Sequence, residues 1–196
     1  MGTKKYLEAI NEIFRKSPVV SFSSIQRIVK NKKNTQYTKQ LIRNLLKQRK
    51  IKKLTKGFYT SHDEVSLLVF CFKPAYLGLQ DALSFHNLWE QETIPVIITT
   101  KKIRSGIRKV FDLNVLIRRI DKKYLFGFEY FKEGNFYFPY SDLEKTFIDL
   151  VYFRQPMDKE VINNFKEKIN RKKLDSYLKK YPKRFKEKVL TGLSYL

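Results

Sequence analysis

Hydrophobic residues recur at helical spacing in three segments near the start of the chain. They predict three helices, over residues 4–16, 23–30 and 34–48. The apolar positions are Leu7, Ile10, Ile13 and Phe14, then Ile25, Ile28 and Val29, then Leu41, Ile42, Leu45 and Leu46. Ser21 and Ser23 are both candidate caps of the second helix, and Asn34 can cap the third after a turn at 30–34.

The segment after the third helix has the alternation of a strand. Ile51 and Leu54 alternate with lysines as far as Lys56-Gly57, where the chain can turn, and Phe58-Tyr59 returns as a second strand. Three helices followed by a hairpin are typical of a winged helix-turn-helix, whose third helix enters the major groove of DNA. The pattern therefore predicts a winged helix-turn-helix DNA-binding domain over residues 1–60.

Residues 61–196 mix strand-like and helix-like segments, which predicts an α+β domain with a small β-sheet and C-terminal helices. The apolar run 64–72 is interpreted as a helix, although a buried strand fits it equally. The expected strands cover 76–78, 93–99, 110–120, 125–131 and 136–138, with a basic loop at 101–108. The expected helices cover 79–87, 141–152, 159–170 and 171–180, followed by a short terminal one. Ser141 and Glu144 have the spacing of a capping box.

Positive charge is concentrated at the two ends of the chain, which has a formal net charge of +22. Residues 1–62 hold 16 Lys/Arg against 2 Asp/Glu, residues 63–156 hold 13 against 12, and residues 157–196 hold 12 against 5. A basic balance of this size implies a polyanionic partner, with nucleic acid ahead of an anionic membrane surface. The first block is therefore the predicted electrostatic footprint for nucleic acid.

The outer face of the third helix carries side chains suited to DNA. Gln and Arg can form paired hydrogen bonds with base edges, whereas Lys neutralises phosphate. The candidate DNA-binding residues are Gln36, Tyr37, Lys39, Gln40, Arg43 and Lys47 on the helix and Lys52, Lys53 and Lys56 on the hairpin. Tyr37 fits the domain core equally well, and an ordinary solvated helix face is the alternative for the rest.

Basic residues of the C-terminal helices form a second candidate polyanion contact. Its residues are Lys172, Lys173, Lys179 and Lys180. A solvated helical surface is the alternative, because lysines on helix faces are usually hydrated.

The sequence offers little for catalysis or metal binding. Two histidines and one cysteine give no zinc-site spacing, and Cys71 lies in an apolar run, as a buried thiol does. We interpret Glu144, Lys145 and Asp149 as a helix cap, a surface lysine and a polar helix face, and His86 as a packed or capping side chain. We therefore expect no enzymatic activity and no cofactor. Without a long apolar segment, we expect a cytoplasmic protein with no membrane partner.

Four motifs follow one another along the chain. They are Ile51-Lys-Lys-Leu-Thr-Lys-Gly57-Phe-Tyr59, Tyr76-Leu-Gly-Leu-Gln-Asp-Ala82-Leu83-Ser-Phe-His86-Asn-Leu88, Pro95-Val-Ile-Ile-Thr-Thr100 and Asp142-Leu-Glu144-Lys145-Thr146-Phe-Ile148-Asp149-Leu150. Their order and spacing resemble the AbiE-type abortive-infection antitoxins, transcriptional regulators with a winged helix and a C-terminal antitoxin domain. Gly78 and Asn87 depart from the Ser and Gly usual in that family.

The resemblance implies a function. Such proteins repress their own operon and counteract a nucleotidyltransferase toxin, by an effect that need not involve a stable complex. The expected partners are thus double-stranded operator DNA with inverted repeats and a cognate toxin. Two alternatives remain open: a winged-helix transcriptional regulator with no toxin partner, and a nucleic-acid-processing enzyme.

Overall fold

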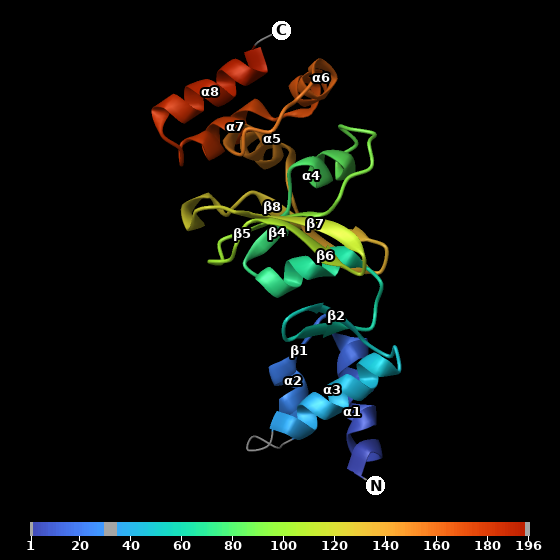
Figure 1. Ribbon diagram of the computed structural model, residues 1–196. Coiled ribbons are helices and arrows are strands. Elements are labelled where there is room, and N and C mark those ends of the chain that lie inside the picture. Colours follow the sequence, from blue (N-terminus) through green and yellow to red (C-terminus); the bar gives the residue numbers. More distant parts are fainter. Residues whose placement is uncertain (1, 30–34, 195–196) are drawn as a thin grey trace. The chain divides into compact units, whose positions relative to one another are not determined.

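The computed structural model describes residues 2–29 and 35–194, and the chain divides into two compact units (Figure 1). Unit 1 comprises Met1–Cys71 together with Val110–Asp112. Unit 2 comprises Phe72–Lys109 and Leu113–Leu196. Helices and two separate sheets make the protein a mixed α+β structure, as expected.

Unit 1 contains three helices and a three-stranded sheet. Its elements are α1 (Gly2–Lys16), β1 (Val20–Ser21), α2 (Phe22–Ile28), α3 (Thr35–Lys47), β2 (Lys52–Thr55) and β3 (Phe58–Thr60). The strand order is β1-β3-β2, and both pairs are antiparallel. The three helices and the hairpin correspond to the predicted elements, whereas the turn expected at 30–34 and the Asn34 cap lie outside the described residues.

Local signals set the ends of these helices. Of the two candidate caps of α2, Ser21 is the one used, because its side-chain oxygen accepts a 3.1 Å hydrogen bond from the backbone N–H of Ser24. After α3, Arg49 adopts a positive φ of 55° and the backbone N–H of Lys50 donates to the carbonyl of Leu45 at 3.0 Å. This hydrogen-bonded turn ends α3 and directs the chain into β2.

The core of unit 1 forms between the apolar stripes predicted for the helices and the inward positions of the hairpin. Its buried members are Ile10, Phe14, Val20, Ile25, Val29, Leu41, Ile42, Leu45, Ile51 and Tyr59. Burial of one face of α3 leaves its other face at the surface, which positions the candidate site.

The apolar run after the hairpin is a helix of the tighter 3₁₀ type, η1 (Val65–Phe72). Nearly all of it is buried, including the free thiol of Cys71. The expected helical character is therefore present, but not as an α-helix. An apolar run without helical periodicity could not distinguish these conformations.

Unit 2 is built on a six-stranded sheet with the order β6-β7-β5-β4-β9-β8. Its strands are β4 (Ala75–Leu77), β5 (Val96–Thr99), β6 (Gly106–Val110), β7 (Leu113–Arg119), β8 (Phe128–Glu133) and β9 (Phe136–Ser141). The β4–β9 and β5–β7 pairs are parallel, whereas the β4–β5 and β8–β9 pairs are antiparallel.

Helices cover one face of this sheet (Figure 1). They are α4 (Gln80–Phe85), α5 (Leu143–Tyr152), α6 (Lys159–Lys168), α7 (Arg171–Leu178) and α8 (Lys183–Ser194), and a short 3₁₀ turn, η2 (Lys122–Tyr124), precedes β8. Each of the three predicted C-terminal helices is present, but the last, α8, has 12 residues and is not the short helix expected. The helix α5 is buried almost along its whole length, so it forms the centre of this layer.

Four strand predictions were wrong in their extent. Strand β5 begins at Val96 rather than at residue 93, and β8 covers residues 128–133 rather than 125–131. The basic segment expected to be a loop contains β6, and its turn to β7 is Phe111-Asp112, with φ angles of 53° and 65°. Turns of this kind usually contain Asn, Asp or Gly, and Asp112 alone is only a weak signal for one. The last strand also continues through Pro139, which pairs with Tyr130, and reaches Ser141.

Candidate functional site

The predicted recognition residues lie on the exposed side of α3. Gln36, Lys39, Gln40, Arg43 and Lys47 are exposed, whereas the buried positions of the helix are Thr38, Leu41, Ile42 and Leu45. The helix is thus divided into a core face and a polar, cationic outer face. The structure brings the predicted helix residues together on one surface.

Hydrogen bonds order the middle of that surface. The Gln40 side-chain amide donates to Asn44 Oδ1 at 3.1 Å, and the Arg43 guanidinium donates to Gln40 Oε1 at 3.1 Å. Because these bonds are exposed, water or a ligand can replace them at little cost. Gln40 and Arg43 are therefore held side by side in positions from which both can turn outward.

Tyr37 lies at the margin of the outer face. It is half-buried, and its ring meets the Tyr6 ring edge-on with centroids 6.3 Å apart. One part of the ring packs in unit 1, as a core residue does, and the remainder is accessible to a ligand. Tyr37 can therefore serve both of its predicted roles, in the core and in DNA contact.

The three hairpin lysines differ in their surroundings. Lys53 and Lys56 are exposed, and Lys56 occupies the turn with Gly57, whose φ is 79°. Lys52 is only partly exposed, forms an ion pair with Asp63, and has its ammonium 5.6 Å from the centre of the Phe111 ring. To bind Lys52, a phosphate would have to displace these contacts. Among the residues that the structure describes, Lys53 has no such contacts to displace.

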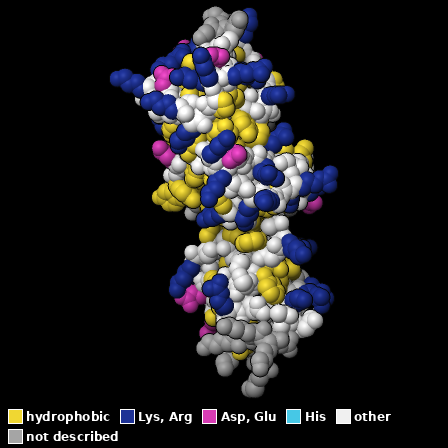
Figure 2. Space-filling view, turned by 90° about the vertical axis from the view of Figure 1, so that its left-hand side faces the viewer, with side chains coloured by type: hydrophobic (Ala, Val, Ile, Leu, Met, Phe, Trp, Pro, Cys, Tyr) yellow, Lys and Arg dark blue, Asp and Glu magenta, His cyan; other side chains and the backbone are white. Residues whose placement is uncertain are grey.

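Charge in the segment that forms α3 and the hairpin has one sign, and Asp63, the partner of Lys52, follows just after it. Residues 34–60 contain eight Lys or Arg and no Asp or Glu. Figure 2 shows that Lys and Arg side chains also greatly outnumber acidic ones on the face of the molecule that it presents. A surface with uncompensated cations attracts polyanions from a distance.

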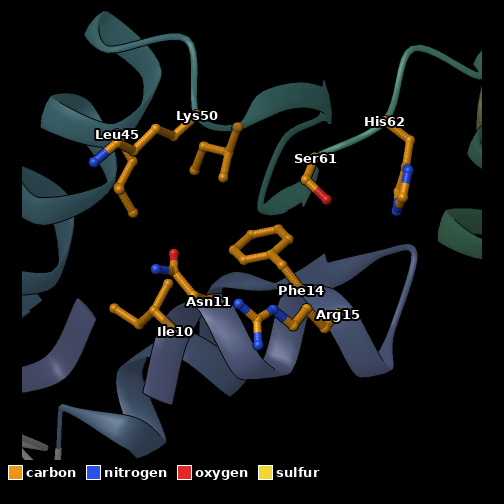
Figure 3. Close-up of a pocket in the computed structure, with 9 residues that line it drawn as sticks. Ile10, Asn11, Phe14, Arg15, Leu45, Lys50, Ser61 and His62 are labelled. Carbon is orange, nitrogen blue, oxygen red and sulfur yellow. The ribbon is translucent and has the colours of Figure 1, made fainter. Parts of the chain in front are cut away.

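Unit 1 also contains a pocket of about 470 Å³ (Figure 3). Its lining residues are Ile10, Asn11, Phe14, Arg15, Leu45, Lys50, Ile51, Ser61 and His62. In Figure 3 the Phe14 ring extends from α1 toward Ser61, and His62 lies at one side. Because Leu45 is on the buried face of α3, the pocket and the cationic face lie on different sides of that helix.

The second group of candidate residues belongs to α7 and the turn that follows it. Lys172, Lys179 and Lys180 are exposed, and the Lys180 ammonium lies 3.7 Å from the centre of the Phe126 ring. Lys173 differs, because its ammonium lies 3.1 Å from Asp142 Oδ2 and 3.4 Å from Glu144 Oε2. Burial lowers the pKa of Lys173, but these two carboxylates outweigh it and raise the pKa overall.

The capping box expected at Ser141 and Glu144 was wrong. Strand β9 includes Ser141, so the cap moves to Asp142, whose side chain accepts a 2.8 Å hydrogen bond from the backbone N–H of Lys145. The Ser141 hydroxyl instead lies 2.7 Å from that of Thr146. Glu144 accepts a 2.8 Å bond from the backbone N–H of Asn170, which joins α5 to the start of α7.

The interpretation of Lys145 and Asp149 as surface residues was also wrong. Both side chains are fully buried and form an ion pair with each other. Asp149 Oδ2 also accepts a 2.5 Å hydrogen bond from the Tyr76 hydroxyl. The Lys145 ammonium lies 3.4 Å from the hydroxyl oxygen of Tyr181. The ammonium is 5.2 Å from the centre of the Phe126 ring.

Burial disfavours the charged forms of this pair. It lowers the pKa of Lys145 and raises that of Asp149, and in each case the partner's charge opposes the shift. Burial, together with Asp149, also raises the pKa of Tyr76 well above its usual range. The network joins β4, α5 and the segment between α7 and α8, and its burial favours a structural role.

A signal for this burial was present in the sequence. Phe147, Ile148, Leu150 and Val151 surround Asp149 with apolar residues on every side of the helix. A helix that is apolar around its whole circumference is buried, and any polar residues within it need partners. The acidic and basic residues of the segment have the spacing of an exposed helix, which obscures this pattern.

Gly127 allows the chain to approach α5 closely. Its φ is +68°, and its carbonyl accepts a 2.9 Å hydrogen bond from the backbone N–H of Asp142. A Cβ at this position would lie 2.9 Å from Lys145 Cβ and 2.9 Å from Tyr177 Cε2. Both the conformation and the contact therefore require glycine.

His86 packs as expected. Its Nε2 lies 2.7 Å from the carbonyl oxygen of Ser141, and its ring meets that of Phe85 edge-on, with centroids 5.2 Å apart. Within residues 2–29 and 35–194, no group of three or more His, Cys, Asp or Glu could hold a metal ion. In the same part of the chain, no helix has the length and apolarity to cross a bilayer.

Comparison with known proteins gives a likeness of fold. No protein-family model matches the chain, and no curated protein sequence matches it. The crystal structure of the Rv2827c protein from Mycobacterium tuberculosis is similar, with a TM-score of 0.60. The likeness covers 95% of this chain and 75% of that one at 10% sequence identity. The two chains share a fold. At this identity the likeness extends to nothing further.

Proposed function

We propose that unit 1 is a winged helix-turn-helix that binds duplex DNA. The order of three helices and a hairpin, with β1 pairing to the hairpin, supports this assignment. Under this proposal α3 enters the major groove, where Gln40 and Arg43 contact base edges. Lys53 and Lys56 on the hairpin contact phosphate.

The observation that carries the proposal is the outer face of α3 with the adjoining hairpin. Five exposed polar or cationic side chains lie on that face, and no carboxylate occurs between residues 34 and 60. A helix face that only contacts water can carry both signs of charge. A surface that neutralises phosphates carries mainly positive charge, as this one does.

We further propose that the protein is a cytoplasmic antitoxin that represses its own operon at inverted repeats and counteracts a nucleotidyltransferase toxin. This step rests on the four motifs that resemble the AbiE-type antitoxins. A plain winged-helix regulator would bind DNA in the same way, and only the toxin separates the two. The burial of Lys145 and Asp149 argues against the third possibility, an enzyme that uses this cluster.

A binding titration tests the DNA proposal with the full chain. A fluorescent duplex from the region upstream of the gene is compared with a random duplex of equal length. Arg43→Ala and Gln40→Ala should each cost about 1–3 kcal/mol on the first duplex and less on the second, because base contacts are lost. Lys102→Ala removes an exposed lysine of unit 2 and serves as the control. Equal losses on both duplexes would contradict a base-reading role for α3.

A further inference from the structure

A second pocket lies in unit 2, where the end of α5 meets the start of α8. Its volume is about 520 Å³, and its lining residues are Val151, Tyr152, Arg154, Pro182, Arg184, Phe185 and Lys188. Small-molecule sites usually measure about 300–1,000 Å³. The pocket is therefore large enough for an organic ligand, and none of its lining residues belongs to the surfaces discussed above.

Three cations surround this pocket. Arg184 and Lys188 are four residues apart on α8, so they lie on the same side of that helix. Arg154 follows the end of α5 with a positive φ of 55°. All three side chains are exposed, and none belongs to an ion pair in the part of the chain that the structure describes. No acidic residue among those described lines the pocket, so the three cations repel one another there, and an anion would relieve that repulsion.

The apolar side of the pocket is aromatic. Tyr124 and Tyr181 are stacked with ring centroids 4.2 Å apart, and Phe185 stacks on Tyr181 at 4.8 Å. Tyr152 meets Phe185 edge-on, at 5.9 Å. Tyr124 and Tyr181 are buried, whereas Phe185 is half-buried and lines the pocket. The stack therefore reaches the pocket at Phe185, where a further planar ring could continue it.

These two features select one class of ligand. Arginine side chains bind phosphate through paired hydrogen bonds, and aromatic side chains stack on nucleobases. We propose that the α5–α8 pocket binds a nucleotide, with its base against Phe185 and Tyr152 and its phosphates near Arg154, Arg184 and Lys188. The nucleotide is either free or the 5′-phosphorylated end of a nucleic-acid strand. This site does not depend on DNA binding by unit 1, since it uses different residues.

Calorimetric titration of the full chain tests the proposal with defined probes. ATP should bind one site per chain, and adenosine and pyrophosphate should each bind at least about tenfold more weakly, because each lacks half of the contacts. Pyrophosphate binding equal to that of ATP would overturn the aromatic half of the site. No measurable ATP binding would overturn the whole.

Variants locate the site. Arg154→Gln and Arg184→Gln should each weaken ATP binding about tenfold or more. Lys159→Gln, an exposed lysine of α6 outside the pocket, should leave it unchanged. These substitutions are at the surface, and circular dichroism checks that the fold is kept. Equal affinities of all variants would overturn the assignment.

The two sources of the ligand are separated by a third probe. A single-stranded 5′-phosphorylated tetranucleotide that binds about tenfold more tightly than ATP, and that loses affinity in Arg184→Gln, identifies a strand end. Binding of ATP as tight as that of the tetranucleotide identifies a free nucleotide. Either result upholds the nucleotide site. Tetranucleotide binding that Arg184→Gln leaves unchanged lies outside the pocket and overturns the strand end as the source of the ligand.

Discussion

At the scale of single residues, the molecule depends on polar groups whose role only packing reveals. A lysine and an aspartate four residues apart have the same spacing on an exposed helix and on a buried one, and only the apolar residues around them distinguish the two. Lys145 and Asp149 are buried because β4, Phe126 and Tyr181 cover α5, and those contacts come from distant parts of the sequence. The helix itself was predictable, whereas the partners of its polar residues were not.

Breaking the buried pair should be costly. Lys145→Met leaves the Asp149 carboxylate without its partner, and we expect a loss of about 3–5 kcal/mol in the free energy of unfolding. A triple variant, Lys145→Met with Asp149→Leu and Tyr76→Phe, removes the charges and the hydroxyl together and should regain most of that stability. Urea unfolding followed by circular dichroism measures both. A single variant as stable as the parent would show that the ion pair is not needed.

Stability should also fall at high pH. Burial and the hydrogen bond to Asp142 raise the pKa of Tyr177 from 10.0 to about 12. A group whose pKa is raised on folding contributes its full stability below the unfolded pKa and loses it as pH rises toward the folded one. The contribution of Tyr177 is therefore complete below pH 10 and is lost between about 10 and 12. Denaturation curves at pH 9, 10 and 11 should show a smaller pH dependence for Tyr177→Phe than for the parent. The same slope for both would contradict the coupling.

At the scale of elements, the predictable features were those with a clear period. The apolar stripes of α1, α2 and α3 and the alternation of β2 predicted these elements, because one face of each is buried. The 3₁₀ helix η1, apolar throughout, has no such period. The turn at Phe111-Asp112 has one turn residue, Asp112, and no Gly or Asn, so the sequence pattern does not predict β6.

The β2–β3 hairpin should act on DNA as an electrostatic element. Lys53→Ala and Lys56→Ala should each weaken binding to operator and random duplexes equally. Each should reduce the slope of log affinity against log salt concentration by about 1, because one phosphate contact is lost and its counterion is no longer released. Lys52→Ala should change the slope less, since its ammonium is paired with Asp63. Anisotropy titrations over a range of salt concentrations measure the slopes. The largest change at Lys52 would contradict this ranking.

At the scale of the whole molecule, the proposals assign DNA binding to unit 1 and protection against the toxin to the rest of the chain. If the antitoxin proposal holds, the full chain should relieve growth arrest caused by a neighbouring nucleotidyltransferase in co-expression. Arg43→Ala should abolish repression of an operon reporter and keep that protection, because it alters only α3 of unit 1. Protection lost together with repression would show that one activity depends on the other. The absence of any protection would favour the plain regulator.

Gly127 has a consequence for how this chain tolerates sequence change. Every other amino acid brings a Cβ into contact with Lys145 and Tyr177 while the backbone stays in a left-handed conformation. In a deep mutational scan, the position should therefore lose abundance with all nineteen replacements alike, with Ala as poorly tolerated as Trp. Its neighbour Phe126, a half-buried ring, should instead accept other large apolar residues. Drift in related sequences should leave this glycine fixed even where the exposed lysines of α3 differ.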